Sequence, residues 1–119
     1  MSSLLFGSMV ASSLTVVSLV VLLMAWMAVR GTLTLNSTFG IRTAATKSSP
    51  QAWDAAHRAT AGASRGLGFT GLAIAAALVI LGATQSLTVV VTAAVVGYLL
   101  VVVLLIRLVL LANRAAMRG

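Results

Sequence analysis

Three long apolar runs, at residues 4–29, 67–83 and 87–112, leave this chain few folds to choose from. A helical run of roughly 20 residues, rising about 1.5 Å per residue, crosses the bilayer's hydrocarbon core of about 30 Å. Hydrophobic residues make up 61% of the sequence and charged residues only 8%. We therefore predict an all-α integral membrane protein with three transmembrane helices, forming one membrane domain over residues 1–119.

The lengths and links of the runs exclude other membrane architectures. Transmembrane strands would be short, alternating in polarity and numerous enough to close a barrel, whereas these runs are long and continuously apolar. Only Thr84, Gln85 and Ser86 join the second run to the third, which requires an antiparallel helical hairpin. Nothing charged precedes Arg30, unlike the basic start of a cleaved signal peptide, so we expect the first span to be retained.

The basic residues set the expected orientation, because cytoplasmic loops carry an excess of Lys and Arg. Apart from Arg107 in the third run, they lie in the 30–66 loop and in the 113–119 tail, and the opposite side has none: the loop holds Arg30, Arg42, Lys47, Arg58 and Arg65, and the tail holds Arg114 and Arg118. The sequence thus predicts a multi-pass protein whose N-terminus and 84–86 turn face outward. The polar loop and C-terminus are then cytoplasmic.

The composition also limits the chemistry. The net charge of +7 flanks apolar spans and lacks interleaved aromatic residues, which favours anionic lipid headgroups as partners and argues against nucleic acid. The chain has no cysteine, one histidine and one acid, so we expect no metal site and no cofactor. Because acid–base catalysis usually needs two titratable groups in distinct environments, we expect no enzymatic activity.

A short helix is predicted inside the polar loop, over about 50–61. Ser49 can cap its free amides and Pro50 suits its first position. Asp54 precedes Arg58 by four residues, the favourable orientation for an ion pair on one helix face. Trp53 and His57 share the neighbouring face, which predicts an amphipathic helix at the cytoplasmic interface with Trp53 as its anchor. Gly62 suggests a break before the second span.

Just upstream, the stretch Asn36-Ser37-Thr38-Phe39-Gly40-Ile41-Arg42-Thr43 combines turn formers with β-branched residues, and Gly40 indicates a turn with positive φ. The stretch resembles the signature of the SdpI family of bacterial membrane immunity proteins. That signature reads Asn, three residues, Gly, an apolar or aromatic residue, Arg and Thr, with a later Trp and His or Asn. The residues here that carry the resemblance are Asn36, Gly40, Ile41, Arg42, Thr43, Thr46, Trp53, His57, Arg58 and Gly62.

The resemblance implies a protein of the bacterial cell membrane that gives immunity to a secreted toxic peptide. Some relatives also hold a soluble transcriptional regulator at the membrane. By this resemblance we expect the chain to be a minimal three-helix core module of the family, without the spans that longer members carry in front. Leu35 is a departure, because many relatives have a proline there.

Three residues have alternative roles that the sequence leaves open. Arg42 either braces the loop together with Asn36 and Thr43, or binds an anionic group with its forked guanidinium. His57 is either a polar residue of an interfacial helix or a proton relay or ligand. Arg107, inside the third run, either extends to the lipid headgroups or contacts Asp54, loop carbonyls or a partner's acid.

A second functional class also fits the sequence. Three helices bury little surface, so much of their apolar flank must face lipid, a second copy or another membrane protein. The chain would then be a small accessory subunit that stabilises a larger transporter, respiratory or envelope-biosynthesis complex. A transporter acting alone is disfavoured, because no span contains Asp or Glu.

Overall fold

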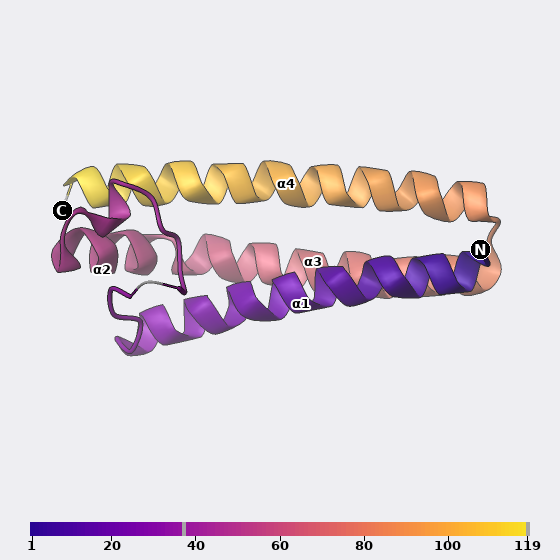
Figure 1. Cartoon of the computed structure of the whole chain (residues 1–119), viewed down its shortest axis with the longest axis horizontal. Helices are drawn as coiled ribbons and strands as arrows, with labels where there is room; N and C mark the ends of the chain where they lie inside the picture. The colour runs from indigo at the N-terminus through magenta and orange to yellow at the C-terminus, as the bar shows by residue number, and fades with distance from the viewer. Residues whose placement is uncertain (37, 119) are drawn as a thin grey trace.

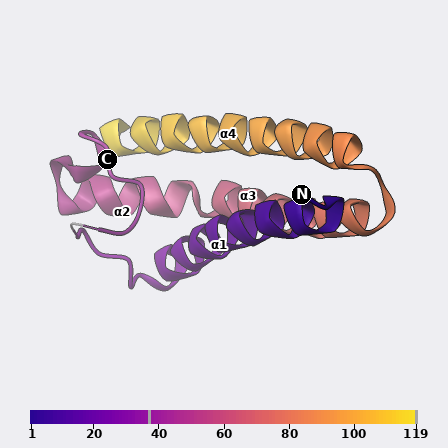
Figure 2. The same cartoon turned by 45° about the vertical axis from the view of Figure 1, so that its right-hand side comes forward.

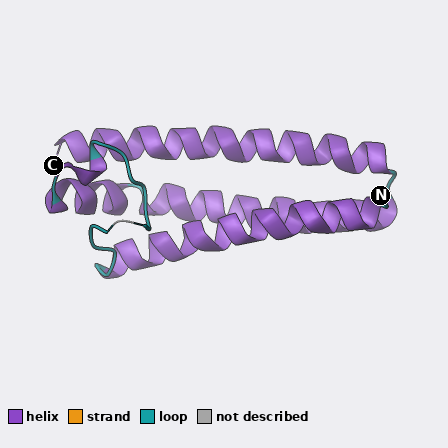
Figure 3. Ribbon diagram, in the orientation of Figure 1, coloured by secondary structure: helices purple, strands orange, loops and turns teal. Residues whose placement is uncertain are grey.

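The computed structural model describes residues 1–36 and 38–118, and in this part of the chain it contains helices and no strand. The elements are α1 (Ser3–Arg30), the 3₁₀ turn η1 (Thr46–Ser48), α2 (Pro50–Ala59), α3 (Ala61–Thr84) and α4 (Leu87–Arg118) (Figures 1 and 3). Helices α1, α3 and α4 are long and apolar enough to cross a membrane. The all-helical fold with three candidate spans is therefore as predicted.

The long helices run side by side in a bundle that extends 49 Å along its longest axis. The N-terminus and the α3–α4 turn lie at one end, which we call the turn end (Figure 1). The loop that follows α1, helix α2 and the C-terminal end of α4 lie at the opposite end, which we call the polar end. The second view shows the same arrangement (Figure 2).

Two helix boundaries differ from the sequence predictions. The helix breaks at Thr60, two residues before the expected Gly62, which instead lies in the first turn of α3. Thr60 has φ −100° and ψ 3°, outside the range of a regular helix, and its Oγ1 hydroxyl donates to the Ala56 carbonyl at 2.7 Å. Helix α4 continues to Arg118, so the expected tail after residue 112 is helical, with Ala112 and Ala116 buried at the polar end.

Glycines hold α1 tightly against α3. A Cβ atom added at Gly7 would lie 2.6 Å from the Leu78 carbonyl oxygen, and one added at Gly82 would lie 2.9 Å from the Ser3 carbonyl oxygen. The Ser3 hydroxyl donates to the Gly82 carbonyl at 2.9 Å, which fastens the two helices at the turn end. Small residues of this kind let two backbones approach closely in membranes, where lipid supplies no hydrophobic force between helices.

Helix α4 is less closely held. Figures 1 and 3 show it running apart from the α1–α3 pair along the turn-end half of the bundle. Its contacts with that pair include Gly97, which faces the Ile74 side chain, and the Tyr98 hydroxyl, which is hydrogen-bonded to Ser13 of α1. Its buried residues near the C-terminus pack on α2 instead. The bundle is thus a tight pair of helices with a third helix anchored mainly at the polar end.

The close contact that Gly7 and Gly82 allow between α1 and α3, which we call the glycine seam, predicts different effects for two glycine-to-alanine substitutions. Gly7→Ala places a methyl group against backbone that cannot move aside, so it should lower the free energy of unfolding by about 1–3 kcal/mol. Gly66→Ala should have little effect or be stabilising, because no atom lies within 4 Å of the added Cβ. Unfolding by SDS titration in mixed micelles measures both, and equal destabilisation would contradict the seam.

Candidate functional site: a clamped loop at the polar end

The side chain of Asn36 stabilises a turn within the loop that joins α1 to η1. Its Oδ1 accepts hydrogen bonds from the backbone amides of Thr38 at 2.8 Å and Phe39 at 2.6 Å. Its Nδ2 donates to the carbonyls of Thr34 and Phe39, each at 2.9 Å. One side chain therefore satisfies backbone groups on both sides of the turn, as asparagine often does in loops.

Gly40 brings the chain back onto α2. Its φ of +112° lies where residues with side chains are rarely found, so the positive φ expected from the sequence is observed. A Cβ there would lie 2.7 Å from Cη2 of Trp53 and 2.9 Å from Nε2 of His57. Glycine is needed at this position both for the backbone conformation and for the space.

His57 then fixes the next residue of the loop. The amide of Ile41 donates to Nε2 of His57 at 2.9 Å, and Nδ1 of His57 lies 2.8 Å from the Trp53 carbonyl oxygen. Since a carbonyl can only accept, Nδ1 carries the proton and the imidazole is neutral. The ring is only 2% exposed, and both of its nitrogens are satisfied by backbone groups.

Trp53 is a core residue, so its expected role as an interfacial anchor is wrong. Its side chain is 1% exposed, and Nε1 donates to the Leu33 carbonyl at 3.1 Å. Its ring lies 4.2 Å from that of His57, centroid to centroid. The face of α2 that carries Trp53 and His57 turns inward, toward the returning loop and α4. Only the other face, with Gln51, Asp54 and Arg58, is exposed.

Two threonines connect the loop to η1 and α4. Thr46 is fully buried; its Oγ1 donates to the Ile41 carbonyl at 2.7 Å and accepts from the Thr43 amide at 2.9 Å. The Thr43 hydroxyl in turn donates to Oδ1 of Asn113 on α4 at 2.5 Å. Asn113 was not singled out from the sequence, although it is a rare amide-bearing residue next to the third apolar run.

We call Leu33, Ile41, Thr46, Trp53 and His57 the loop clamp. These residues are buried, and the side chains of Thr46, Trp53 and His57 form hydrogen bonds with backbone amides and carbonyls of the loop. Without these partners, the backbone groups would lie unpaired beside an apolar bundle, which is energetically costly. Of the residues that carry the sequence signature, the structure gathers most in or next to the clamp: Asn36, Gly40, Ile41, Thr43, Thr46, Trp53 and His57.

Three signature residues lie outside the loop clamp. Arg42 is exposed and makes no hydrogen bond or ion pair within residues 1–36 and 38–118, so the expected bracing contacts are not observed in that part of the chain. The bracing falls to Asn36, Thr46 and His57. Arg58 contacts Asp54, with Nε 3.0 Å from the carboxylate, on the exposed face of α2. Such exposed pairs contribute about 0.3–0.5 kcal/mol. No atom lies within 4 Å of a Cβ added at Gly62.

Arg107 is exposed and lines a small hollow of about 230 Å³ between α3 and α4, together with Gly66 and Thr70. The expected alternative of a contact with Asp54 is not observed in the described part of the chain, where that carboxylate is engaged by Arg58. The position of Arg107 suits a side chain that extends toward lipid headgroups.

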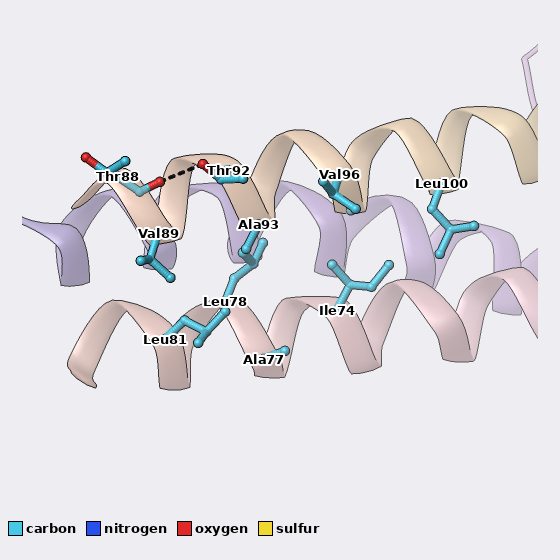
Figure 4. A pocket seen from close by; sticks show the side chains of 11 residues that line it. Ile74, Ala77, Leu78, Leu81, Thr88, Val89, Thr92, Ala93, Val96 and Leu100 are labelled. Carbon is cyan, nitrogen blue, oxygen red and sulfur yellow. Dashed lines mark hydrogen bonds between the residues drawn. The ribbon is translucent and has the colours of Figure 1, made fainter. Parts of the chain in front are cut away.

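A larger groove lies between α3 and α4 near the turn end. It encloses about 600 Å³ and is almost wholly apolar, with Ile74, Ala77 and Leu81 on one wall and Val89, Ala93 and Val96 on the other (Figure 4). Thr92 lines it too, but its hydroxyl donates to the Thr88 carbonyl at 2.8 Å, so its donor is not free to bind a ligand (Figure 4). The groove exists because α4 diverges from α3 here.

Three long apolar helices with a clamped polar loop describe a multi-pass membrane protein, which is the class that this fold defines. The family model of the SdpI/YfhL protein family matches residues 32–111 of the 119, so the chain belongs to that family. The matched region begins just before the loop clamp and includes α2, α3 and most of α4. Comparisons with curated proteins and with solved structures gave no match.

The Gly40 turn gives a sharp test of the loop clamp. Gly40→Ala should destabilise the loop, because the methyl group would overlap Trp53 and His57 in addition to straining the backbone. Gly31→Ala is the matched control: Gly31 also has positive φ, 74°, but only the end of the Arg58 side chain lies near. Hydrogen exchange at the Ile41 amide should rise much more in the first variant. Equal rates in both would show that the close contacts are unimportant.

The loop clamp should also weaken in acid. Burial lowers the pKa of His57, opposed by the Trp53 backbone hydrogen bond and by Asp54. The unfolded chain, with a pKa of about 6.5, therefore takes up the proton first. The contribution of neutral His57 to stability is complete above that pH and is lost as the pH falls toward the lower folded value. Protonation also removes the Nε2 acceptor for Ile41.

Hydrogen exchange at the Ile41 amide, corrected for its intrinsic pH dependence, should thus be faster at about pH 5.5 than at about pH 7.5. His57→Gln keeps an acceptor near the Nε2 position but does not titrate, so its corrected exchange should be independent of pH. Equal protection of Ile41 in the natural protein at both pH values would rule out this role for the imidazole.

Proposed function

We propose that this SdpI/YfhL family member is a non-enzymatic immunity protein, which protects the cell membrane against a membrane-active toxic peptide. The family match over residues 32–111 is the observation that carries the proposal. The matched region contains the whole loop clamp and the apolar groove between α3 and α4. Recognition of an apolar peptide needs shape and hydrocarbon surface, both of which this groove offers, and it needs no catalytic group.

The distribution of charge supports an orientation for this role. Arg30, Arg42, Lys47, Arg58 and Arg65 precede or begin α3, and Arg114 and Arg118 end α4, so the basic side chains gather at the polar end. By the positive-inside rule the polar end is cytoplasmic and the turn end faces outward. The groove between α3 and α4 then opens in the outer half of the membrane, on the side from which a secreted peptide arrives.

We propose different binding roles for the two ends of the bundle. At the turn end, an apolar segment of the toxic peptide packs between α3 and α4, which keeps it from assembling a pore. At the polar end, the loop clamp fixes α2 so that Asp54 and Arg58 are exposed, and Arg42 of the loop is exposed as well; in the proposed orientation they face the cytoplasm. This exposed, charged surface is the site we propose for a soluble regulator, since the inward face of α2 is already occupied.

The first test is a deletion strain and its parent, both exposed to the secreted peptide fraction of the parent's own stationary culture and of related strains. The deletion strain should lose membrane potential, measured with a voltage-sensitive dye, and the gene supplied in trans should restore it. Unchanged sensitivity to every fraction would overturn the immunity proposal.

Paired variants then test the groove itself. Ala77→Phe fills the groove without adding charge and should reduce protection to the level of the deletion strain. Ala76→Phe, one residue away on the exposed face of α3 and outside the groove, should protect fully. Both proteins must reach the membrane in equal amounts, as an immunoblot would establish. Full protection by Ala77→Phe would exclude the groove as the peptide site.

The accessory-subunit role remains the second candidate, because the same groove could receive a helix of a larger membrane protein. In that case deletion should lower the abundance of one membrane complex, measured by quantitative proteomics of the membrane fraction. Loss of a complex without any change in toxin sensitivity would favour this second role over immunity.

A further inference from the structure

A second groove, distinct from the one between α3 and α4, runs between α1 and α3 at the polar end. It encloses about 500 Å³. Leu19, Leu23 and Trp26 of α1 line it, and Phe69 of α3 lines the opposite side, while Arg30 and Arg65 stand at its polar mouth. The floor forms because Gly68 has no side chain, which leaves room for Leu22 to pack over α3. The groove therefore combines an apolar trough with a cationic end.

The two arginines need a counter-charge that the chain does not supply. The sequence has a single acidic side chain, Asp54, and its carboxylate is engaged by Arg58 on α2. Arg30 is also held in place, since its guanidinium carbon lies 4.6 Å from the centroid of the Trp26 ring. A cation stacked on an aromatic ring keeps its N–H groups free to fork onto phosphate oxygens. Both arginines are exposed and available for this.

The length of the groove indicates what fills it. The eleven residue steps from Leu19 to Arg30 rise about 16 Å at about 1.5 Å per residue, which is about half of a 30 Å hydrocarbon layer. A transmembrane helix of a partner would need contacts across the whole layer. A lipid acyl chain needs only one leaflet, and its phosphate lies at the interface, where Trp is also favoured.

We infer that this groove is a binding site for one anionic phospholipid. The phosphate sits between Arg30 and Arg65, and an acyl chain lies along Leu19, Leu23 and Phe69. Two guanidinium groups favour a headgroup with net negative charge, such as phosphatidylglycerol or cardiolipin, over a zwitterionic one. The site is independent of the proposed toxin groove, because it lies on the other side of α3 and in the opposite leaflet.

Native mass spectrometry of the purified protein tests this site in detergent micelles doped with phosphatidylglycerol, cardiolipin or phosphatidylcholine. The natural protein should retain one anionic lipid and little phosphatidylcholine. The R30Q/R65Q variant should retain the anionic lipid at least about tenfold less, since it loses both guanidinium groups that bind the phosphate. R114Q/R118Q removes the same charge from the end of α4 and should retain the lipid normally.

A third variant separates the trough from the charge. Leu23→Trp fills the trough and leaves both arginines in place, so it too should lose the lipid, while circular dichroism verifies that the helices are intact. Equal loss in R30Q/R65Q and R114Q/R118Q would overturn the site in favour of general charge attraction. Retention by Leu23→Trp, or displacement of the lipid by inorganic phosphate alone, would show that the trough holds no acyl chain.

Discussion

The hydrogen bond from the Ile41 amide to Nε2 of His57 is the contact on which the polar end depends. The loop after α1 must cross the bundle without helical hydrogen bonds of its own, close to apolar helices where unpaired amides and carbonyls are costly. His57, Trp53 and Thr46 supply the missing partners from α2 and η1. They can do so only because α2 turns this face inward and because Gly40 lets the backbone approach the two rings.

The grooves follow from how unequally the three long helices are held. Glycines draw α1 and α3 together, whereas α4 is fastened at the polar end through its contacts with α2 and through the Thr43–Asn113 hydrogen bond. Toward the turn end α4 stands away from α3, and an apolar groove opens there. On the other side of α3, α1 and α3 line a second groove, and Arg30 and Arg65 give it one charged end. One bundle thus offers two surfaces of different chemistry.

Hydropathy alone was enough to predict the helices, because a run that must hide its backbone from lipid has few alternatives. Local spacing predicted the Asp54–Arg58 pair, the Ser49 cap and the Gly40 turn, since each depends on residues within a few positions. The orientation of α2 was not predictable in this way. Its amphipathic pattern fits a membrane interface as well as a protein core, and only the returning loop decides that Trp53 is buried.

Three other features were not predicted, and one of them depends on a contact between distant segments, which a single sequence does not display. Asn113 gains its partner from a threonine 70 residues earlier in the chain. The helix breaks at Thr60, although the glycine at position 62 was the stronger helix-breaking signal in the sequence. Arg42 belongs to the same signature as the loop clamp, yet its side chain is exposed, which the signature alone did not indicate.

The most direct measurement of the loop clamp is the nitrogen NMR spectrum of the His57 imidazole in micelles near neutral pH. Our account requires a protonated Nδ1, an unprotonated Nε2 and a scalar coupling across the hydrogen bond between Nε2 and the Ile41 amide nitrogen. A proton on Nε2, or an imidazole that exchanges freely between its two neutral forms, would contradict it and leave the loop without its central contact.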